Sequence, residues 1–111
     1  MTKVFDRAAA LELLDRDEEL LQYLIDSFLT ENKFERPVLE NLISEKKFKE
    51  AASYVHATKG AARQLCMEKL KSSAQALEDF LRGKTKGNAL KLIDKMCLDY
   101  NEAIHTLTKF A

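Results

Sequence analysis

Apolar residues recur at intervals of three and four positions along nearly the whole chain, and no stretch alternates convincingly between apolar and polar residues. This spacing places the apolar residues on one side of an α-helix. We therefore expect an all-α protein in which each helix turns one face towards a shared core.

Local signals predict where these helices begin and end. Asp6 is placed to cap a short first helix at 7–14. A second helix is expected after Asp15, with acidic residues in its first turn, and Pro37 indicates a break or kink before a shorter helical segment. The later helices are expected at about 47–65, from a turn at 66–67 to about 82, and at about 88–109, with 83–87 as a loop.

Helices with one apolar face and short connections pack antiparallel to each other. The sequence thus predicts an antiparallel four-helix bundle, whose first helix is interrupted near Pro37, with a short N-terminal cover helix over one end. The positions expected to face the core include Leu20, Leu24 and Phe28, then Phe48, Ala51, Val55, Ala62 and Leu65, and finally Leu90, Ile93, Cys97, Tyr100, Ile104 and Leu107.

Length and charge narrow the class of protein. The 111 residues fit a single domain, 1–111, and 18 basic residues balance 18 acidic ones, which argues against general nucleic-acid binding. No apolar run approaches the roughly 20 residues that cross a bilayer, and the N-terminus lacks a secretory signal. Cys66 and Cys97 match no metal-ligand spacing, so we expect two reduced thiols in a cytoplasmic protein without nucleic-acid or membrane partners.

The segment 54–65 contains the residues most able to carry chemistry. His56 is offset by about 100° from the core residue Val55. Lys59, Gly60 and Arg63 follow His56 by three, four and seven positions, so they share its part of the helix surface. A neutral imidazole is a competent nucleophile near neutral pH. We expect Lys59 to neutralise a phosphoryl group on this ring and Arg63 to extend the positive field.

Gly60 is an unusual residue for the middle of a helix, where it costs about 0.5–1 kcal/mol relative to Ala. Helical side chains lean towards the N-terminus, so a side chain at this position would crowd His56. Its absence leaves the ring open to the backbone of a macromolecular partner.

The segment His56-Ala57-Thr58-Lys59-Gly60 resembles the signature of the histidine phosphotransfer (HPt) domain family, His-x-Leu-Lys-Gly followed by a second Gly. Further resemblances are Phe5-Asp6, the helix containing Leu20, Leu24 and Phe28, and Leu77-Glu78. Two positions depart from the signature, because Thr58 replaces Leu and Cys66 replaces the second Gly.

The resemblance implies a four-helix bundle that takes a phosphoryl group from a receiver aspartate and passes it to another receiver. By position, His56 is the phosphorylated residue, Lys59 the supporting cation and Gly60 the clearance residue. Glu78 resembles the residue on the adjacent helix that hydrogen-bonds the imidazole and fixes its tautomer. The implied partners are response-regulator receiver domains, including one from a hybrid sensor histidine kinase.

The chain is expected to be a phosphoryl carrier and no enzyme in its own right. Gly83-Lys84-Thr85 resembles the end of a nucleotide-binding loop, but the position of the first glycine is occupied by Glu78. The acidic residues at 15–19 are explained as residues of a helix start. No cofactor or metal is therefore expected on this chain, and Mg²⁺ is expected on the partner receiver.

Two other classes of function stay open at this stage. A helical interaction module could dock a receiver without phosphotransfer, and an enzyme would need Glu78 as a general base near His56. His105 lacks the Lys-Gly companions and is expected to be an ordinary surface residue. Phe5, Leu14 and Leu21 could form an apolar docking rim, although core packing explains them equally well. A monomer is expected.

Overall fold

The computed structural model describes residues 3–111, and the regular structure in this range consists of six α-helices without a strand. The all-α fold class is therefore confirmed. The helices are α1 (Arg7–Leu13), α2 (Glu18–Glu31), α3 (Arg36–Ser44), α4 (Phe48–Gln64), α5 (Glu68–Leu81) and α6 (Ala89–Thr108). Their ends lie within a few residues of those predicted from the sequence.

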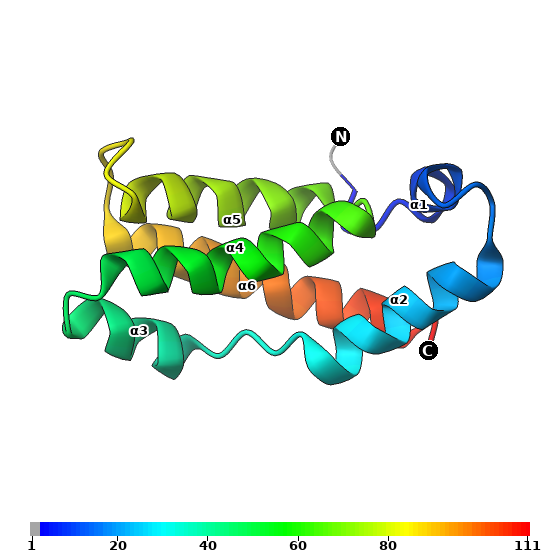
Figure 1. The fold of residues 1–111 in the computed structure, drawn as a ribbon, viewed down its shortest axis with the longest axis horizontal. Helices are drawn as coiled ribbons and strands as arrows, with labels where there is room; N and C mark the ends of the chain where they lie inside the picture. The colour runs from blue at the N-terminus through cyan, green and yellow to red at the C-terminus, as the bar shows by residue number, and fades with distance from the viewer. Residues whose placement is uncertain (1–2) are drawn as a thin grey trace.

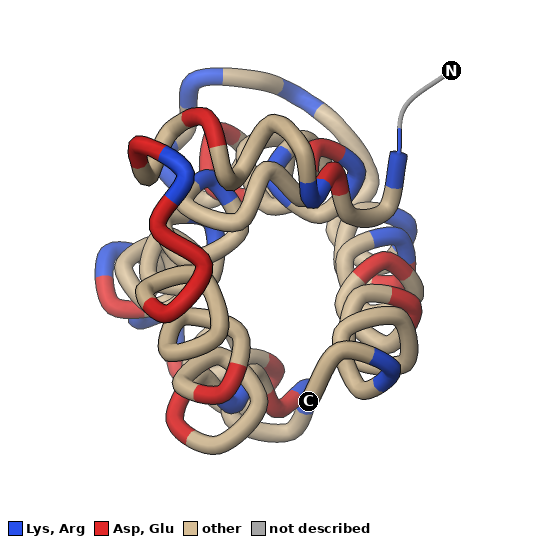
Figure 2. The backbone as a smooth tube through the Cα atoms, turned by 90° about the vertical axis from the view of Figure 1, so that its right-hand side faces the viewer, with Lys and Arg blue, Asp and Glu red and all other residues tan. Residues whose placement is uncertain are grey.

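The molecule measures 42 × 27 × 20 Å along its principal axes. The long helices run along the longest of these axes (Figure 1). In Figure 1, α4, α5 and α6 lie alongside each other, and α2 and α3 follow one another along the remaining side. The end-on view of Figure 2 shows the helices arranged around a common centre. The short α1 lies at the end of the molecule where α4 ends (Figure 1).

Side-chain caps explain where three of the helices begin. A carboxylate oxygen of Asp6 accepts a hydrogen bond from the Ala9 backbone N–H at 3.0 Å, and Asp17 does the same for Leu20 at 3.0 Å. Asn88 caps α6 in the same way. These bonds satisfy backbone donors that the first turn of a helix leaves free.

The end of α4 has a left-handed backbone conformation at a residue other than glycine. Cys66 has a φ of 53°, and the Met67 N–H reaches back to the Ala62 carbonyl oxygen at 2.9 Å. Glycine commonly occupies this position after a helix because it has no Cβ to clash. The departure of Cys66 from the family signature therefore leaves the expected turn in place, but with a less favourable residue in it.

All six helices contribute residues to the core, α1 through the buried Ala10. Leu21, Ile25, Phe28, Leu39, Val55, Ala62, Leu70, Leu77, Met96 and Leu107 are among its buried members. Three residues predicted to face inwards are instead exposed: Leu20 (41%), Phe48 (44%) and Leu90 (58%). Each lies in the first turn of its helix. Their side chains lie where the helix begins, and periodicity alone does not show where the core ends along the helix axis.

Two tyrosines hold the break between α2 and α3. The Tyr100 hydroxyl donates to the Asn32 carbonyl oxygen at 2.8 Å and accepts from the Phe34 N–H at 3.2 Å. The Tyr54 hydroxyl accepts from the Glu35 N–H at 2.8 Å. Phe34 is buried, and its ring lies 5.5–5.6 Å from the rings of both tyrosines. Side chains from α4 and α6 thus supply the hydrogen bonds that the interrupted helix loses.

Within residues 3–111, no helix combines the length and the hydrophobicity that crossing a membrane requires.

Candidate functional site

His56 lies in the middle of α4 on the side turned to solvent. Its side chain is 55% exposed. Gly60 lies one turn further along α4, and a Cβ built on it would meet no atom within 4 Å, helical backbone aside. The surface beside Gly60 is therefore bare, and the ring is not walled in by its neighbours. The Cβ itself would not touch the imidazole, so the crowding expected from the sequence would need a longer side chain.

Glu78 approaches His56 from α5, the helix packed against α4. Both of its carboxylate oxygens lie 3.1 Å from Nδ1 of the imidazole. The Glu78 side chain is only 7% exposed, whereas the ring projects outwards. The predicted proximity of Glu78 to His56 is thus present in the structure, and the contact leaves the Nε2 edge of the ring free of the carboxylate.

Lys59 does not lie on the exposed surface around His56, where the sequence placed it. Its side chain is 7% exposed, and Nζ lies 2.9 Å from Oε1 of Glu78. Nζ also donates to the side-chain oxygen of Gln75 at 3.0 Å. Because α4 and α5 pack closely, the position three residues after His56 turns towards α5 instead of towards water. The ammonium therefore contacts the carboxylate behind the imidazole.

Sequence reasoning missed two residues of this site. Arg82 directs Nε to Oε2 of Glu78 at 2.8 Å. Gln75 accepts from Lys59 and donates through its amide to Asp79 at 2.8 Å. Arg82 follows Glu78 by four residues, a spacing at which helical side chains meet, so that pair could have been found from the sequence. The contact of Gln75 with Lys59 crosses between helices and has no local signal.

The surroundings of Glu78 keep its carboxylate ionised. Burial by itself raises the pKa of this group, but hydrogen bonds from Lys59, Arg82 and His56 outweigh burial and lower the pKa to about 2. An ionised carboxylate can only accept hydrogen bonds. A neutral His56 therefore carries its proton on Nδ1, next to Glu78, and presents the lone pair of Nε2 to solvent.

Residues 19–107 match the model of the Hpt domain family. These residues make up most of the chain. The chain belongs to the Hpt domain family. Searches among curated proteins and among solved structures found no match. Hpt domains act in histidine phosphotransfer in two-component signalling, as phosphocarrier modules distinct from kinases, and they interact with response-regulator receiver domains.

The other predicted residues of this Hpt domain lie apart from the imidazole. Arg63 is exposed, and the described residues provide it with no ion pair, but it lies two turns from His56. His105 is exposed on α6. Thr58 is buried, and its hydroxyl donates to the Asn32 side-chain oxygen at 3.4 Å, so this departure from the signature joins α4 to the end of α2.

An apolar pocket of about 440 Å³ lies where α1 and α2 meet the end of α4. Leu14 lines it, with Leu13 and Leu20 beside it and Arg63 at α4. Leu21, proposed as a rim residue, is a core residue at 1% exposure. Phe5 packs edge-on against Phe110 at the other terminus. Of the three residues predicted to form a docking rim, only Leu14 lines this pocket.

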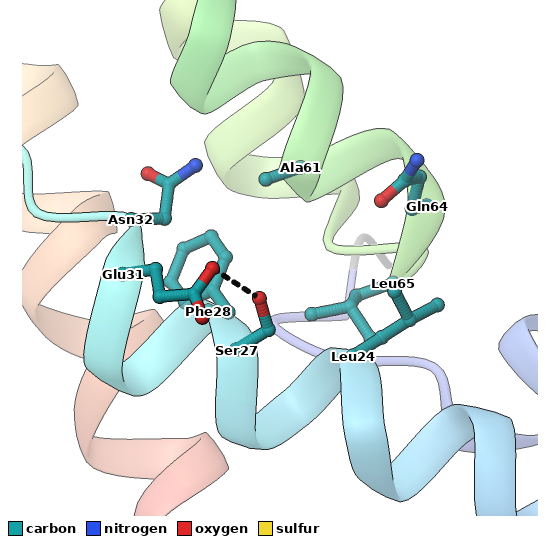
Figure 3. Close-up of a pocket in the computed structure, with 8 residues that line it drawn as sticks. All are labelled: Leu24, Ser27, Phe28, Glu31, Asn32, Ala61, Gln64 and Leu65. Carbon is teal, nitrogen blue, oxygen red and sulfur yellow. Dashed lines mark hydrogen bonds between the residues drawn. The ribbon is translucent and has the colours of Figure 1, made fainter.

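A second hollow, the α2–α4 groove, has a volume of about 330 Å³ (Figure 3). Phe28, Leu24 and Leu65 provide apolar surface, while Glu31, Asn32 and Gln64 provide polar groups. Figure 3 shows the hydrogen bond from the Ser27 hydroxyl to Glu31 within it. Across residues 3–111, no three His, Cys, Asp or Glu side chains are arranged to hold a metal ion.

Proposed function

We propose that this Hpt domain carries a phosphoryl group on Nε2 of His56, accepting it from a receiver aspartate and passing it to another receiver. The observation that carries the proposal is an exposed imidazole whose Nδ1 contacts an ionised carboxylate while its other nitrogen faces solvent. Gly60 adds a bare surface over which a partner's backbone can approach.

In the proposed step, the lone pair of Nε2 attacks the phosphorus atom of the receiver's aspartyl phosphate in line. An N–P bond forms, the P–O bond to the aspartate breaks, and the aspartate leaves as a carboxylate. The proton stays on Nδ1, since a carboxylate with a pKa of about 2 does not take it. Mg²⁺ belongs to the partner receiver in this proposal and offsets charge on the transferred group.

Basic residues of this chain support the transfer step in two ways. Lys59 and Arg82 hold Glu78 against Nδ1, so they position the imidazole through the carboxylate. The field of the Lys59 ammonium also acts on the phosphoryl group, although Nζ contacts Glu78 and Gln75. Arg63 extends the positive field along α4. In the reverse reaction the ring leaves as the neutral Nδ1–H tautomer.

The geometry of Glu78 disfavours an enzyme that hydrolyses phosphohistidine. A general base must reach the attacking water, and its pKa should lie near the working pH. Glu78 contacts the Nδ1 edge, away from the proposed phosphoryl group, and its pKa is about 2. The domain therefore acts in this proposal as a covalent carrier without a kinase or ATP site.

We also propose that α2 and α3 form one interrupted member of a four-helix bundle with α4, α5 and α6, covered at one end by α1. The end-to-end course of α2 and α3 supports this arrangement. The domain is proposed to act as a monomer in the cytoplasm, where receiver domains, including those of hybrid sensor kinases, would meet it.

The test is incubation with purified, phosphorylated receiver domains and Mg²⁺, followed by mass-spectrometric mapping of the acid-labile label. We expect the label on His56, its loss in His56→Gln, and an unchanged helical circular dichroism spectrum. His105→Gln is the matched control and should keep the label.

Label on His105, or wild-type labelling in His56→Gln, would overturn the proposal. Receiver binding in the complete absence of label would instead support a docking module without phosphotransfer.

A further inference from the structure

The α2–α4 groove has the chemistry of a site for a long cationic side chain. Its accessible apolar surface comes from the partly buried Leu24, with the buried Phe28 and Leu65 beneath it, and this surface suits an aliphatic stem. Glu31 is the one charged residue among those that line it, and no cation lines it. Lysine and arginine side chains bury their stems on apolar surface while the charged head stays near water.

Glu31 is available to such a head group. Its side chain accepts a hydrogen bond from the Ser27 hydroxyl at 3.2 Å, and no ion pair is formed by Glu31 in the described part of the chain. A carboxylate has about four acceptor positions, so one neutral donor leaves it free to bind a cation. The side-chain oxygen of Gln64 adds a further acceptor beside the groove (Figure 3), whereas the Asn32 side-chain oxygen accepts from Thr58.

The charge of the surrounding helices favours a basic group at this position. Residues 6–31, which contain α1 and α2, have eight acidic and two basic residues. By contrast, α4 has two exposed basic residues, Lys49 and Arg63, and one exposed acidic residue, Glu50, because Lys59 is buried against Glu78. A partner that covers both helices is therefore attracted by its basic groups to the α2 side and by its acidic groups to the α4 side.

The groove lies within reach of a partner seated on His56. His56, Gly60 and Gln64 follow one another at intervals of four residues, so they form one row along the surface of α4. The row is about 12 Å long, and an interface of about 800 Å² per partner is roughly 30 Å across. A partner whose backbone passes over Gly60 thus arrives at the groove beside Gln64.

From these observations we infer that the α2–α4 groove receives an arginine or lysine side chain of the receiver that docks on His56. The head group pairs with Glu31 and the stem lies against Leu24. Receivers with a basic residue at the matching position are favoured over others, so the groove selects partners. This inference rests on the proposed function for the identity of the partner, but the preference of the groove for a cation can be tested alone.

The first experiment needs no receiver. ¹⁵N-labelled protein is titrated with N-acetyl-L-arginine amide, and N-acetyl-L-norleucine amide serves as the uncharged probe of similar length. We expect amide shifts concentrated at Ser27, Glu31, Asn32, Ala61 and Gln64 with the arginine probe. Glu31→Gln should weaken binding at least ~3-fold, in line with loss of one exposed ion pair.

Asp26→Asn is the matched control, since Asp26 is an exposed acid of α2 that does not line the groove. It should bind the arginine probe like the wild type. Equal shifts with both probes, shifts scattered over the acidic residues of α2, or equal loss in Glu31→Gln and Asp26→Asn would overturn the inference.

The second experiment uses the receiver that labels His56 fastest. Glu31→Lys should weaken its binding about 5–10-fold in calorimetry, whereas Asp26→Lys should stay within about 2-fold of the wild type. Changing one basic residue of that receiver to Glu should restore binding to the Glu31→Lys variant. Equal weakening by both variants, or no such rescue across the receiver's basic surface residues, would contradict the inference.

The two experiments distinguish a failure of the proposed function from a failure of the groove inference. If no receiver labels His56, the proposed function fails, and the arginine titration still decides whether the groove binds a cation. If His56 is labelled normally while Glu31→Lys has no effect on receiver binding, the groove inference fails and the transfer reaction stands.

Discussion

Glu78 contacts His56, Lys59 and Arg82 through only two oxygen atoms, and it does so with 7% of its side chain exposed. A buried carboxylate is costly unless charged partners compensate it. Two cations and the imidazole provide that compensation, so the same side chain that contacts His56 also contributes to stability. The chemistry of the site and the stability of the fold are therefore coupled at this residue.

This coupling predicts a specific pH dependence of stability. The folded pKa of Glu78 is about 2, below the ordinary 4.5. A lowered carboxyl pKa stabilises the fold fully above the unfolded pKa, and the contribution disappears as the pH falls from 4.5 towards 2. It amounts to about 3 kcal/mol, from about 1.4 kcal/mol per pKa unit. The free energy of unfolding, measured with urea, should therefore fall more steeply between pH 6 and pH 2 for the wild type than for Glu78→Gln.

Glu78→Gln should also be less stable at neutral pH, because the buried Lys59 ammonium loses its carboxylate. Parallel stability curves for the two proteins in the acid range would show that folding does not lower the pKa of Glu78.

At the scale of a helix, α4 has three different environments around its circumference. Val55 and Ala62 pack in the core, Lys59 turns towards α5, and His56 with Gly60 faces solvent. Because a helix has 3.6 residues per turn, residues only one to four positions apart in the sequence point into different environments. The exposed strip is therefore free to vary for docking while its neighbours hold the helix in place.

Gly60 provides a test in which stability and docking should move in opposite directions. Gly60→Ala should raise the free energy of unfolding by about 0.5–1 kcal/mol, because a mid-helix glycine is unfavourable and the new Cβ meets no atom within 4 Å. The same substitution should slow phosphotransfer from a receiver, and Gly60→Leu should slow it further. Chemical denaturation and rapid-quench labelling measure the two effects.

Ala8→Leu adds bulk to the exposed surface of a different helix, α1, and should leave the transfer rate unchanged. Wild-type transfer in Gly60→Leu would mean that no partner backbone passes over this position.

At the scale of the whole molecule, the break between α2 and α3 joins segments that are far apart in the sequence. Tyr100 of α6 and Tyr54 of α4 both hydrogen-bond to backbone groups of residues 32–35, and Phe34 packs between their rings. The interruption near Pro37 is therefore anchored by two helices, α4 and α6. It ties the break between α2 and α3 to α4, which carries His56.

Tyr100→Phe should destabilise the domain without removing a ring from the core. The change leaves the Asn32 carbonyl oxygen and the Phe34 N–H without their partner, at a cost of about 1–3 kcal/mol. Tyr23→Phe is the control, because Tyr23 is 64% exposed and should stay within about 0.5 kcal/mol of the wild type. Equal midpoints in urea for the two variants would rule out a stabilising role of the Tyr100 hydroxyl.

The sequence predicted most of the helices because apolar spacing and capping residues are local signals. His56, Gly60 and the proximity of Glu78 followed from a short motif and the family resemblance. Local signals could not reveal the hydroxyl bonds of Tyr54 and Tyr100, since those depend on how distant helices pack. The burial of Lys59 depends in the same way on the distance between α4 and α5.

The bare surface at Gly60 also bears on how long a signal can be stored. A phosphoryl group on Nε2 would project towards bulk water from the half-exposed ring, and within residues 3–111 no side chain comes within 4 Å of a Cβ built on Gly60 beside it. Its lifetime would then follow the spontaneous hydrolysis of phosphoimidazole, so in the proposed relay the supply of acceptor receivers must outpace that chemical decay. The openness proposed to admit two successive partners would thus limit the domain to brief storage.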